Sequence, residues 1–538
     1  MHESPPGVTL GEFLPLSAAR HPDRTCFALA DGSRFTFAET NARVNRLVDA
    51  LRSQGLGRGD RVAVLALDSH RYMEVVLACM KLGAVYVPLN YRLQRDEVDT
   101  LLRRAAPVAL FHDARYDDLL ASVATAHPTL RLVVRLDDEG DAAGYEQLLA
   151  AGRDVEPDVV CDDRDQIALA FTSGTTGLPK GVMQSQRMLK NITYAGLAEY
   201  QARPDDVRYT AAPTFHISGV CGLFLGIATG YSSYLLPQFE PATVLDLLSG
   251  GEVSAAFLVP TMISSVLQQP GAAERSYDRL RLMIYGASPI SPTLLRHAME
   301  VFGCEFLQAF GAGTEAGLQS VLTPEDHRLA LAGRPELLRS CGRPSFGVAM
   351  RVVDADLREV GVGEVGEVAT RSDQVMDGYL EMPEETARAF AGGWFRAGDM
   401  GYRDEEGYLY LHGRAKDMII RGGENIYPIE IETVLAEHPS IAQVAVVGVD
   451  DEHWGEVVRA FVVPAAGQVV DAEVLRAHCA SRLARYKVPR DVVVLDAMPL
   501  NASGKILKRE LRTRIDGPNM TLTSGSGSAD TRGHDPRV

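Results

Sequence analysis

The sequence predicts an α/β protein with a large N-terminal domain of parallel or mixed sheets packed with helices, followed by a small α+β domain. Three observations favour this fold class. The chain has 538 residues, which is too long for one compact core. Helical and strand patterns alternate through residues 1–170 and again through 205–320, as they do in βαβ units. From about residue 360, short strands with glycine turns replace this alternation.

The first alternating segment contains a clear helix start. Thr36 and Glu39 have the spacing of a capping box, and apolar residues then recur with the period of a helix. These apolar residues are Val44, Leu47, Val48 and Leu51. A buried strand over 62–67, a helix over 72–82 and an apolar run over 84–89 follow, so we expect largely parallel sheets here.

The last part of the chain predicts a separate small unit that begins after Arg414. Its expected elements are a helix near 428–436, strands near 441–449 and 457–463, a helix near 472–485 and a closing segment over 501–512. We therefore place an N-terminal domain at 1–415 and a C-terminal domain at 416–512. Residues 513–538 are expected to be a disordered tail, because a Ser/Gly-rich composition cannot form a core.

Composition and charge exclude several classes of protein. The net charge is −17, which argues against nucleic acid as a partner because phosphate neutralisation needs clustered Lys and Arg. There is no run of about 18 apolar residues and no secretory signal, so we expect a cytoplasmic protein without a membrane span. The seven cysteines are scattered and form no Cys-x-x-Cys pair, which predicts neither a zinc site nor a disulfide framework.

The most informative motif is the segment 172–181, Thr-Ser-Gly-Thr-Thr-Gly-Leu-Pro-Lys-Gly, which follows an apolar strand over 167–171. Its glycines allow a tight turn with N–H groups pointing inward, its hydroxyls add donors, and Lys180 adds a positive charge. Such a concave loop suits a polyphosphate, although the spacing is not that of a Walker A loop. A plain Gly/Thr surface loop is the alternative interpretation.

Six further motifs follow in order along the chain, and each alone is also typical of an ordinary turn. They are Pro-Thr-Phe-His-Ile-Ser-Gly at 213–219, Tyr-Gly-Ala-Ser-Pro at 285–289, Trp-Phe-Arg-Ala-Gly-Asp at 394–399, Gly-Arg-Ala-Lys-Asp at 413–417, Arg-Gly-Gly-Glu-Asn-Ile-Tyr-Pro at 421–428 and Ser-Gly-Lys-Ile at 503–506. Together with the segment 172–181 they span about 340 residues, so their order is not a coincidence.

In these motifs the chain resembles the adenylate-forming superfamily, which includes acyl-CoA synthetases, adenylation domains of nonribosomal peptide synthetases and luciferases. The resemblance covers residues 8–512 and is strongest to the acyl-CoA ligase branch. It implies a small β-barrel-like subdomain and a mobile C-terminal domain. A fainter likeness to pathway ligases of the platensimycin/platencin type suggests secondary metabolism.

The resemblance also implies an AMP-forming acid–thiol ligase that uses ATP/AMP, Mg²⁺ and coenzyme A. In such enzymes a carboxylate attacks the α-phosphate of ATP, which gives acyl-AMP and pyrophosphate. The small domain then rotates, and a thiol displaces AMP.

The resemblance assigns nucleotide contacts to matching residues. The β- and γ-phosphates would be held by Thr172, Ser173, Gly174, Thr175, Thr176, Gly177 and Lys180. The adenine pocket would be lined by Gly286, Ala287 and Ser288, with Phe310, next to Gly311, stacked on the ring. Asp399 would bind the ribose hydroxyls, and Arg414 would support it.

Further roles concern the two half-reactions. Lys505 would bridge the carboxylate and the α-phosphate, since a lysine can neutralise charge that develops in the transition state. Lys416 would be the hinge of the domain rotation. The loop with Gly422, Gly423 and Glu424 would border the pantetheine channel. His216 would gate between that channel and the acid pocket, although a satisfied core histidine is the alternative.

The segment 308–317 departs from the family pattern. Ala312 and Gly313 stand where the family has one residue, and Phe310 stands where it has Tyr. Beyond them, Thr314 would contact the α-phosphate and Glu315 would hold Mg²⁺. An added residue supplies up to about 3.8 Å of chain, whereas catalytic geometry tolerates about 0.5 Å.

The extra residue therefore leaves two possibilities open. Either Gly313 bulges out and the geometry is kept, or the magnesium position is disturbed and adenylation is weakened. Two smaller departures, Ala397 in place of Thr and Gln186 in place of His, point to weaker adenylation.

Three functions follow from these patterns. The first is a two-step acyl-CoA ligase acting on a small-molecule carboxylic acid. The second is a ligase specialised for thioester formation from acyl-AMP that a separate adenylating enzyme supplies. The third is a free-standing adenylation enzyme that loads a carrier protein. A luciferase-like oxidation shares every motif, while a scaffolding role would predict loss of Lys505, Asp399 or the phosphate loop.

The acid is expected to be aryl, medium-chain or polycyclic rather than acetate. We base this on a pocket floor with little side-chain bulk, to which we assign His216, Gly219, Gly222, Gly286 and Gly317.

Overall fold

The computed structural model describes residues 7–121, 127–137, 144–158, 161–172, 179–422, 424–451, 453–465, 467–500, 506–513 and 521–522. The chain divides into two compact units. The first comprises residues 1–397 and 402–410, and the second comprises 398–401 and the chain from 411 onward. The proposed hinge at Lys416 stays a prediction. Most of the expected tail lies outside the described residues.

The first unit contains a nine-stranded sheet whose interior pairings are parallel. Its strand order is β15 (Arg343–Pro344), β14 (Ser320–Leu322), β13 (Glu305–Phe310), β12 (Leu282–Gly286), β11 (Ala255–Leu258), β9 (Val207–Thr210), β10 (Ser232–Leu235), β1 (Thr25–Leu29) and β2 (Arg34–Thr36). Antiparallel strands close both edges. The connecting helices are α8 (Ile217–Thr229), α9 (Pro241–Ser249), α10 (Pro260–Leu267), α11 (Pro292–Phe302) and α12 (Pro324–Leu331).

A seven-stranded sheet forms the second layer of the first unit. Its order is β18 (Gly378–Tyr379), β8 (Lys180–Ser185), β7 (Gln166–Thr172), β4 (Val85–Pro88), β3 (Arg61–Leu65), β5 (Ala109–His112) and β6 (Leu132–Arg135). The pairings from β7 to β6 are parallel, while β8 joins as an antiparallel strand. Its helices are α2 (Phe37–Ser53), α3 (His70–Leu82), α4 (Arg95–Ala105), α5 (Asp117–Leu120), α6 (Tyr145–Ala151) and α7 (Gln186–Glu199).

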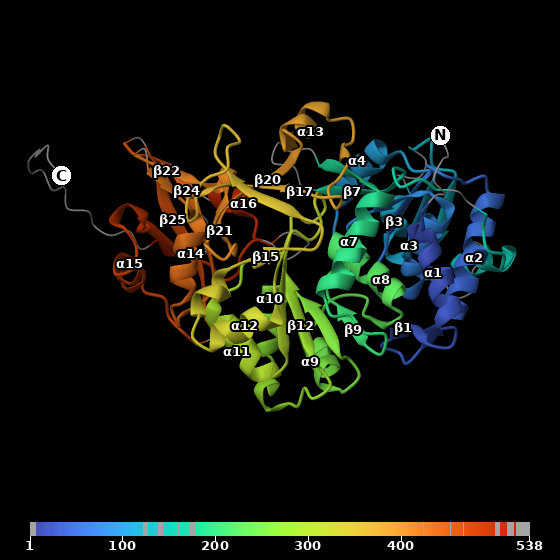
Figure 1. The fold of residues 1–538 in the computed structure, drawn as a ribbon, viewed down its shortest axis with the longest axis horizontal. Coiled ribbons are helices and arrows are strands. Elements are labelled where there is room, and N and C mark those ends of the chain that lie inside the picture. The colour runs from blue at the N-terminus through green and yellow to red at the C-terminus, as the bar shows by residue number, and fades with distance from the viewer. Residues whose placement is uncertain are drawn as a thin grey trace, which may run out of the picture. The chain divides into compact units, whose positions relative to one another are not determined.

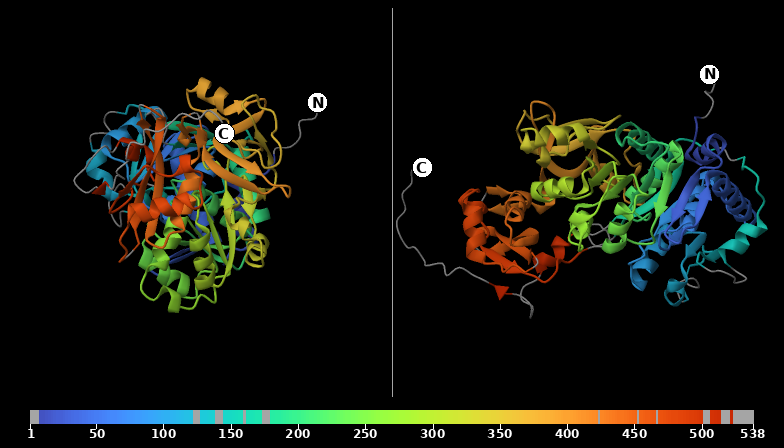
Figure 2. Two further views of the ribbon diagram at one scale, coloured as in Figure 1. Left: turned by 90° about the vertical axis from the view of Figure 1, so that its left-hand side faces the viewer. Right: turned by 90° about the horizontal axis from the view of Figure 1, so that it is seen from below.

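The two sheets share one hydrophobic core. It holds apolar side chains from strands of both sheets and from α1 (Leu10–Arg20), α2, α3, α7 and α8. Figure 1 and Figure 2 show the blue N-terminal helices and the green helices α7 and α8 lying side by side. The predicted capping box is present, because Thr36 N donates to Glu39 (2.8 Å) and Glu39 N donates to the Thr36 hydroxyl (3.1 Å).

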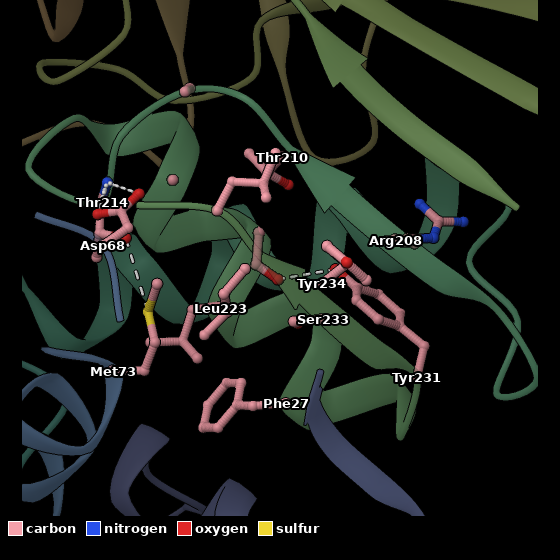
Figure 3. A pocket seen from close by; sticks show the side chains of 15 residues that line it. Phe27, Asp68, Met73, Arg208, Thr210, Thr214, Leu223, Tyr231, Ser233 and Tyr234 are labelled. Atoms are coloured by element: carbon pink, nitrogen blue, oxygen red, sulfur yellow. Dashed lines mark hydrogen bonds between the residues drawn. The ribbon is translucent and has the colours of Figure 1, made fainter. Parts of the chain in front are cut away.

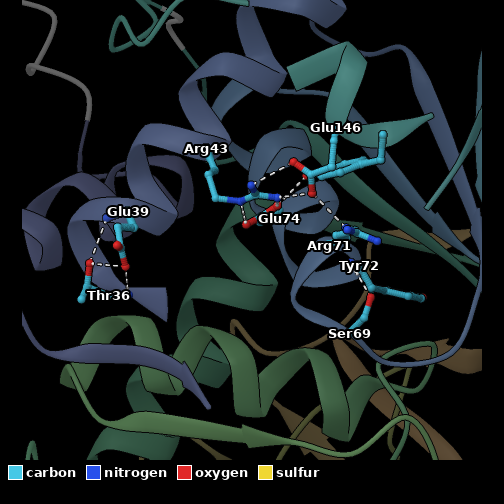
Figure 4. Close-up of polar contacts among 9 residues, drawn as sticks. Thr36, Glu39, Arg43, Ser69, Arg71, Tyr72, Glu74 and Glu146 are labelled. Atoms are coloured by element: carbon cyan, nitrogen blue, oxygen red, sulfur yellow. Dashed lines mark hydrogen bonds and ion pairs between the residues drawn. The ribbon is translucent and has the colours of Figure 1, made fainter. Parts of the chain in front are cut away.

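A polar network joins α2, α3 and α6 inside this region (Figure 4). The Arg43 guanidinium donates to both carboxylate oxygens of the fully buried Glu74, at 2.6 and 3.0 Å. It also contacts Glu146, which Arg71 binds at 3.0 Å, and the Tyr145 hydroxyl donates to Glu74 at 2.7 Å. Burial raises the pKa of Glu74, and the Arg43 pair opposes that shift.

The region after residue 344 forms the expected small β subdomain. It is a five-stranded sheet of β16 (Ala349–Val353), β17 (Gly366–Arg371), β20 (Trp394–Arg403) and β19 (Phe390–Ala391), with β21 (Leu409–Arg414) paired to β20. The helix α13 (Pro383–Ala389) precedes β19.

The second unit is α+β. Its strands are β22 (Ile419–Arg421), β23 (Glu424–Ile426), β24 (Ile441–Asp451), β25 (Gly455–Pro464), β26 (Asp491–Val494) and β27 (Thr521–Leu522), and its helices are α14 (Pro428–Ala436), α15 (Ala472–Ala480) and α16 (Lys508–Thr513). The predicted helix near 472–485 was too long: α15 ends at Ala480, and a short 3-10 turn follows over Arg485–Lys487. The α/β fold class is confirmed. Within the described residues no helix is long and apolar enough to cross a membrane.

Candidate active site

The two ends of the phosphate loop are held together by a strand pair. Thr172 is the last residue of β7 and Lys180 the first of β8, and the two are partners in the antiparallel register. The residues between them, Ser173, Gly174, Thr175, Thr176, Gly177 and Leu178, lie outside the described residues, so their predicted phosphate contacts stay predictions.

Two side chains that we did not single out from the sequence contact the second end of this loop. The Lys180 ammonium lies 4.7 Å from the centre of the Tyr379 ring on β18, a cation–π contact. The Arg104 guanidinium on α4 donates to the Pro179 carbonyl and lies 5.8 Å from the Phe171 ring. No sequence signal marked these residues, because they are distant in the chain from the loop that they contact.

Glu315 and Thr172 come together in the structure. The Thr172 hydroxyl donates to Glu315 Oε1 at 3.4 Å, although 143 positions separate them in sequence. The neighbouring Thr314 is buried, and its carbonyl accepts a hydrogen bond from the Gln184 amide of β8 at 2.8 Å. The Glu315 carbonyl accepts from Met376 N at 2.8 Å. The predicted α-phosphate and magnesium residues are therefore anchored to strand β8 and to the 376 segment.

The extra residue before Thr314 lies in a tight loop. Gly313 adopts a left-handed φ of +58° and Gly317 one of +53°, and Gly317 N donates to the Gly313 carbonyl at 3.0 Å. The loop closes where Gln319 N donates to the Phe310 carbonyl at 2.8 Å. Glycine is well suited to position 313, because L side chains rarely adopt this backbone conformation. A Cβ on Gly311 would lie only 1.8 Å from the Gly317 carbonyl oxygen.

The residues predicted to line the adenine pocket gather at the carboxyl ends of β12 and β13. Gly286 pairs with Ala309, and a Cβ at Gly286 would lie 2.1 Å from the Ala309 carbonyl oxygen, so only glycine fits. Ala287 is exposed with a left-handed φ of +67°, which is strained for a residue with a side chain. Half-buried Ser288 follows it, and half-buried Phe310 ends β13.

His216 is the N-cap of α8. Its Nδ1 accepts a hydrogen bond from Ser218 N at 3.4 Å. The preceding Phe215 meets the Tyr91 ring edge-on at 5.3 Å. Thr214 N donates to both carboxylate oxygens of Asp68, at 3.0 and 3.1 Å. Asp68 was not predicted from the sequence, and it fixes the segment that carries His216.

Two glycines that we took as small pocket-floor residues have a packing role. A Cβ at Gly219 would lie 2.4 Å from the Pro213 carbonyl oxygen, and one at Gly222 would lie 2.8 Å from Thr210 Oγ1. Glycine is therefore required by the close approach of α8 to neighbouring backbone and strand. Both glycines line a cavity of about 30 Å³, which Figure 3 shows.

Gln186 also has a packing role. It is fully buried at the start of α7, and its Oε1 accepts a hydrogen bond from Leu10 N at 3.2 Å. This departure from the family pattern therefore ties α7 to α1.

Within the second unit, Asp399 and Arg414 form a pair. Arg414 Nε donates to the largely buried Asp399 at 3.1 Å. Lys416 lies in a 3-10 turn (Ala415–Asp417), where burial, and next the charge of Arg414, lower its pKa. Asp417 pairs with Arg512 at 2.9 Å.

The other predicted residues of this unit follow the Asp399–Arg414 pair along the chain. Gly422 has a φ of +58°, and a Cβ there would lie 2.9 Å from the Trp454 ring. Glu424 is exposed at the start of β23. Gly423 and Lys505 lie outside the described residues.

The residues around Glu315 suit a magnesium nucleotide. A carboxylate beside a hydroxyl supplies oxygen ligands, and Mg²⁺ is commonly bound through one or two carboxylates plus substrate phosphates. Across the part of the chain that the structure describes, no group of three or more His, Cys, Asp or Glu could hold a metal by itself. The donor set therefore fits a metal that is carried largely by the nucleotide.

Comparison with known proteins identifies the family of the chain. Residues 14–380 match the AMP-binding enzyme family, and residues 430–505 match the AMP-binding enzyme C-terminal domain. The fatty acid–[acyl-carrier-protein] ligase ScoC of Streptomyces coeruleorubidus is 36% identical over 505 residues, 93% of this chain and 95% of ScoC. The feruloyl-CoA synthase of an Amycolatopsis species is 36% identical over 502 residues, 93% of this chain and 98% of the synthase.

Solved structures show the same likeness. ATP-bound MatB from Rhodopseudomonas palustris has a TM-score of 0.86 at 29% identity, covering 94% of this chain and 98% of MatB. The anthranilate CoA ligase AuaEII in complex with anthranoyl-AMP has a TM-score of 0.87 at 25% identity, covering 95% and 97%. The chain belongs to the AMP-binding enzyme family, in the acyl-CoA ligase branch of the adenylate-forming superfamily.

Proposed function

We propose that this protein catalyses both half-reactions of an AMP-forming acid–thiol ligase and joins a carboxylic acid to coenzyme A. The observation that carries the proposal is the contact between Glu315 and Thr172, on a segment that Gln184 and Met376 hold in place. This anchoring, together with the left-handed Gly313, supports retention of the magnesium position despite the extra residue.

In the first half-reaction, a carboxylate oxygen of the acid bonds to the α-phosphorus of ATP, and the bond to the pyrophosphate oxygen breaks. Lys180, at the base of the phosphate loop, would bind the departing phosphates. Lys505 would neutralise charge that develops between the acid and the α-phosphate, as electrostatic stabilisation requires. Glu315 would help to hold Mg²⁺, which shields the phosphate charges when it is bound.

In the second half-reaction, a thiol sulfur bonds to the acyl carbon, the bond to AMP breaks, and the thiol proton is released. This step consumes acyl-AMP and involves no pyrophosphate. Gly422, Gly423 and Glu424 would border the path of the pantetheine arm, and His216 would separate that path from the acid.

Measurement of each half-reaction separately tests the proposal. ATP–pyrophosphate exchange is measured with a panel of acids, and CoA ester formation is measured with synthetic acyl-AMPs. We expect both activities. Rapid ester formation from acyl-AMP without any exchange would contradict the proposal and support a ligase that a separate adenylating enzyme supplies.

A carrier protein is the second candidate acceptor, because one relative, ScoC, is named as a carrier-protein ligase whereas others are named as CoA ligases. Competition between CoA and a purified phosphopantetheinyl carrier for one acyl-AMP decides between them. We expect CoA to be acylated faster, and preferential loading of the carrier would contradict the assignment.

The acid is proposed to be an aryl or a medium- to long-chain acid. Relatives are named for feruloyl, fatty, indoleacetate and anthranilate substrates. A panel in which only acetate and propionate support exchange would contradict this substrate class.

A further inference from the structure

A small cavity lies between helix α8 and strands of the nine-stranded sheet. Its volume of about 30 Å³ is enough for roughly one water-sized group. The walls combine apolar side chains, such as Phe27 and Leu223, with the hydroxyl-bearing side chains of Thr210, Ser233 and Tyr234 (Figure 3). A cavity with such polar walls can hold a polar group that forms hydrogen bonds with them.

Asp68 is the carboxyl group that borders this cavity. Among the described residues, the hydrogen bonds to its two oxygens come from the backbone and the side chain of Thr214. A carboxylate offers about four lone-pair sites, so it can accept a further donor. By accessible area Asp68 is half-buried. Its carboxyl group is nevertheless surrounded by protein, and this desolvation raises its pKa to about 7.

The cation in the cavity wall is already engaged. Arg208 pairs with Asp206 at 2.9 Å and lies 5.1 Å from the Tyr231 ring. In Figure 3 it lies on the far side of the view from Asp68. The charged group that acts on Asp68 is Asp113, a second carboxyl. An enclosed carboxyl next to a polar cavity is normally matched by a donor, because its desolvation is otherwise unfavourable.

The cavity adjoins the region where the acid is proposed to bind. Gly219 and Gly222, assigned to the acid pocket, line it, and Thr214 lies two residues before the proposed gate His216. We propose that this cavity is the distal end of the acid pocket, where Asp68 accepts a hydrogen bond from a hydroxyl or amino group on the acyl part of the substrate. The proposal rests on the ligase function argued above.

The substrate class is therefore an acid with a hydrogen-bond donor remote from its carboxylate. A hydrogen bond to the ionised form of Asp68, which predominates above pH 7, should give roughly a 10- to 100-fold preference over a methyl group at the same place. The apolar walls would hold the intervening carbon skeleton.

The test uses matched acids that differ only in a terminal methyl, hydroxyl or amino group, at several chain lengths and on an aryl ring. Each is measured for kcat/KM in ATP–pyrophosphate exchange and for Kd by calorimetry in the presence of AMP. We expect the wild-type protein to prefer the donor-bearing acid at least tenfold at one or more lengths. Asp68→Asn, which keeps an acceptor for Thr214 N, should reduce that ratio several-fold.

Asp113→Asn is the matched control. Asp113 is also a buried carboxyl whose pKa is raised, to about 6, and it accepts from Leu67 N at 2.7 Å, but it does not line the cavity. Both ratios are measured at pH 8, above the pKa of Asp68, so that loss of the nearby Asp113 charge does not change its protonation. There the donor-to-methyl ratio of this variant should match that of the wild type. Thermal unfolding confirms that both variants are folded.

The proposal is overturned if the wild type shows no donor preference at any length, which means that the cavity holds water only. It is also overturned if both Asn variants lower the ratio equally. Absence of exchange with every acid would instead contradict the adenylation half of the proposed function. The calorimetric ratio still tests Asp68 in that case, because it requires no turnover.

Discussion

Single residues carry the chemistry of this site, and long-range contacts place them. Thr172 and Glu315 meet from segments 143 positions apart, and Thr214 and Asp68 from segments 146 positions apart. Each contact joins a strand end or loop to a charged side chain. Substitutions at these positions therefore have effects that can be separated by half-reaction or by pH.

Glu315→Gln should lower ATP–pyrophosphate exchange by about 10²–10³, the loss typical when a preorganised electrostatic group is removed. Ester formation from supplied acyl-AMP should change by less than about fivefold, because that step involves no pyrophosphate. Glu381→Gln, which makes the same change at an exposed surface carboxylate, is the control. Equal losses in both half-reactions would contradict a magnesium-binding role.

Asp68 should make stability depend on pH. Its pKa is about 7 in the folded protein and about 3.8 when exposed, so the folded state binds the extra proton between these values. Protonated Asp68 therefore contributes its full stabilisation below about pH 4, and this contribution to the free energy of unfolding is lost as the pH rises to 7. Compared with Asp68→Asn, the wild type should lose at most about 4 kcal/mol over this window.

Urea unfolding of both proteins at pH 4.5, 6 and 8 measures this difference. A constant difference in unfolding free energy would show that Asp68 is not perturbed.

At the scale of elements, one strand pair supports the phosphate loop, and one polar network holds three helices together. The edge strand β18 pairs with β8 and brings Tyr379 over Lys180. Helices α2, α3 and α6 are joined by the buried network of Figure 4. We expect the Tyr379–Lys180 contact to affect phosphate binding and the buried network to affect the free energy of unfolding.

Tyr379→Leu should raise the KM for ATP roughly 2- to 30-fold, as expected for loss of a cation–π contact worth about 0.5–2 kcal/mol. Tyr379→Phe keeps the ring and should stay within twofold of the wild type. Initial rates of pyrophosphate exchange over a range of ATP concentrations measure the effect. If Phe and Leu are equally impaired, the hydroxyl and not the ring is responsible.

Glu74→Ala should destabilise the protein by about 3–5 kcal/mol, because Arg43 then loses the partner of a buried ion pair. Glu146 is the matched comparison: it also contacts Arg43, but its side chain is 42% exposed. Glu146→Ala should therefore cost about 1 kcal/mol or less. Chemical denaturation measures both, and similar losses would contradict the role of burial.

At the scale of the whole molecule, the two units were expected to move about Lys416. Lys416→Pro would fix φ near −65° and remove a backbone donor there. We expect pyrophosphate exchange to stay within about threefold, whereas ester formation from acyl-AMP should fall at least tenfold. Lys416→Ala keeps backbone freedom and is the control. If the Pro variant keeps full ester formation, rotation does not occur at this residue.

Much of the fold could be predicted from the sequence, because periodicity and capping are local. The capping box of α2 and the bounds of α14 agree with the structure. The end of α15 was missed, since a helical pattern continues past the residue where the helix stops. Asp68, Tyr379 and Arg104 were also missed, because their contacts depend on strand order and on residues far away in the chain.

The glycine face of α8 has a consequence for engineering this enzyme toward other acids. Side chains added at Gly219, Gly222 or Gly226 would meet neighbouring atoms at 2.4, 2.8 and 2.9 Å, so these three positions have no room for a larger residue. Libraries are better directed at the opposite wall, where Thr210 and Tyr234 present side chains that can be exchanged for smaller ones. Selectivity would then be changed through the strands, while the glycines of the helix are kept.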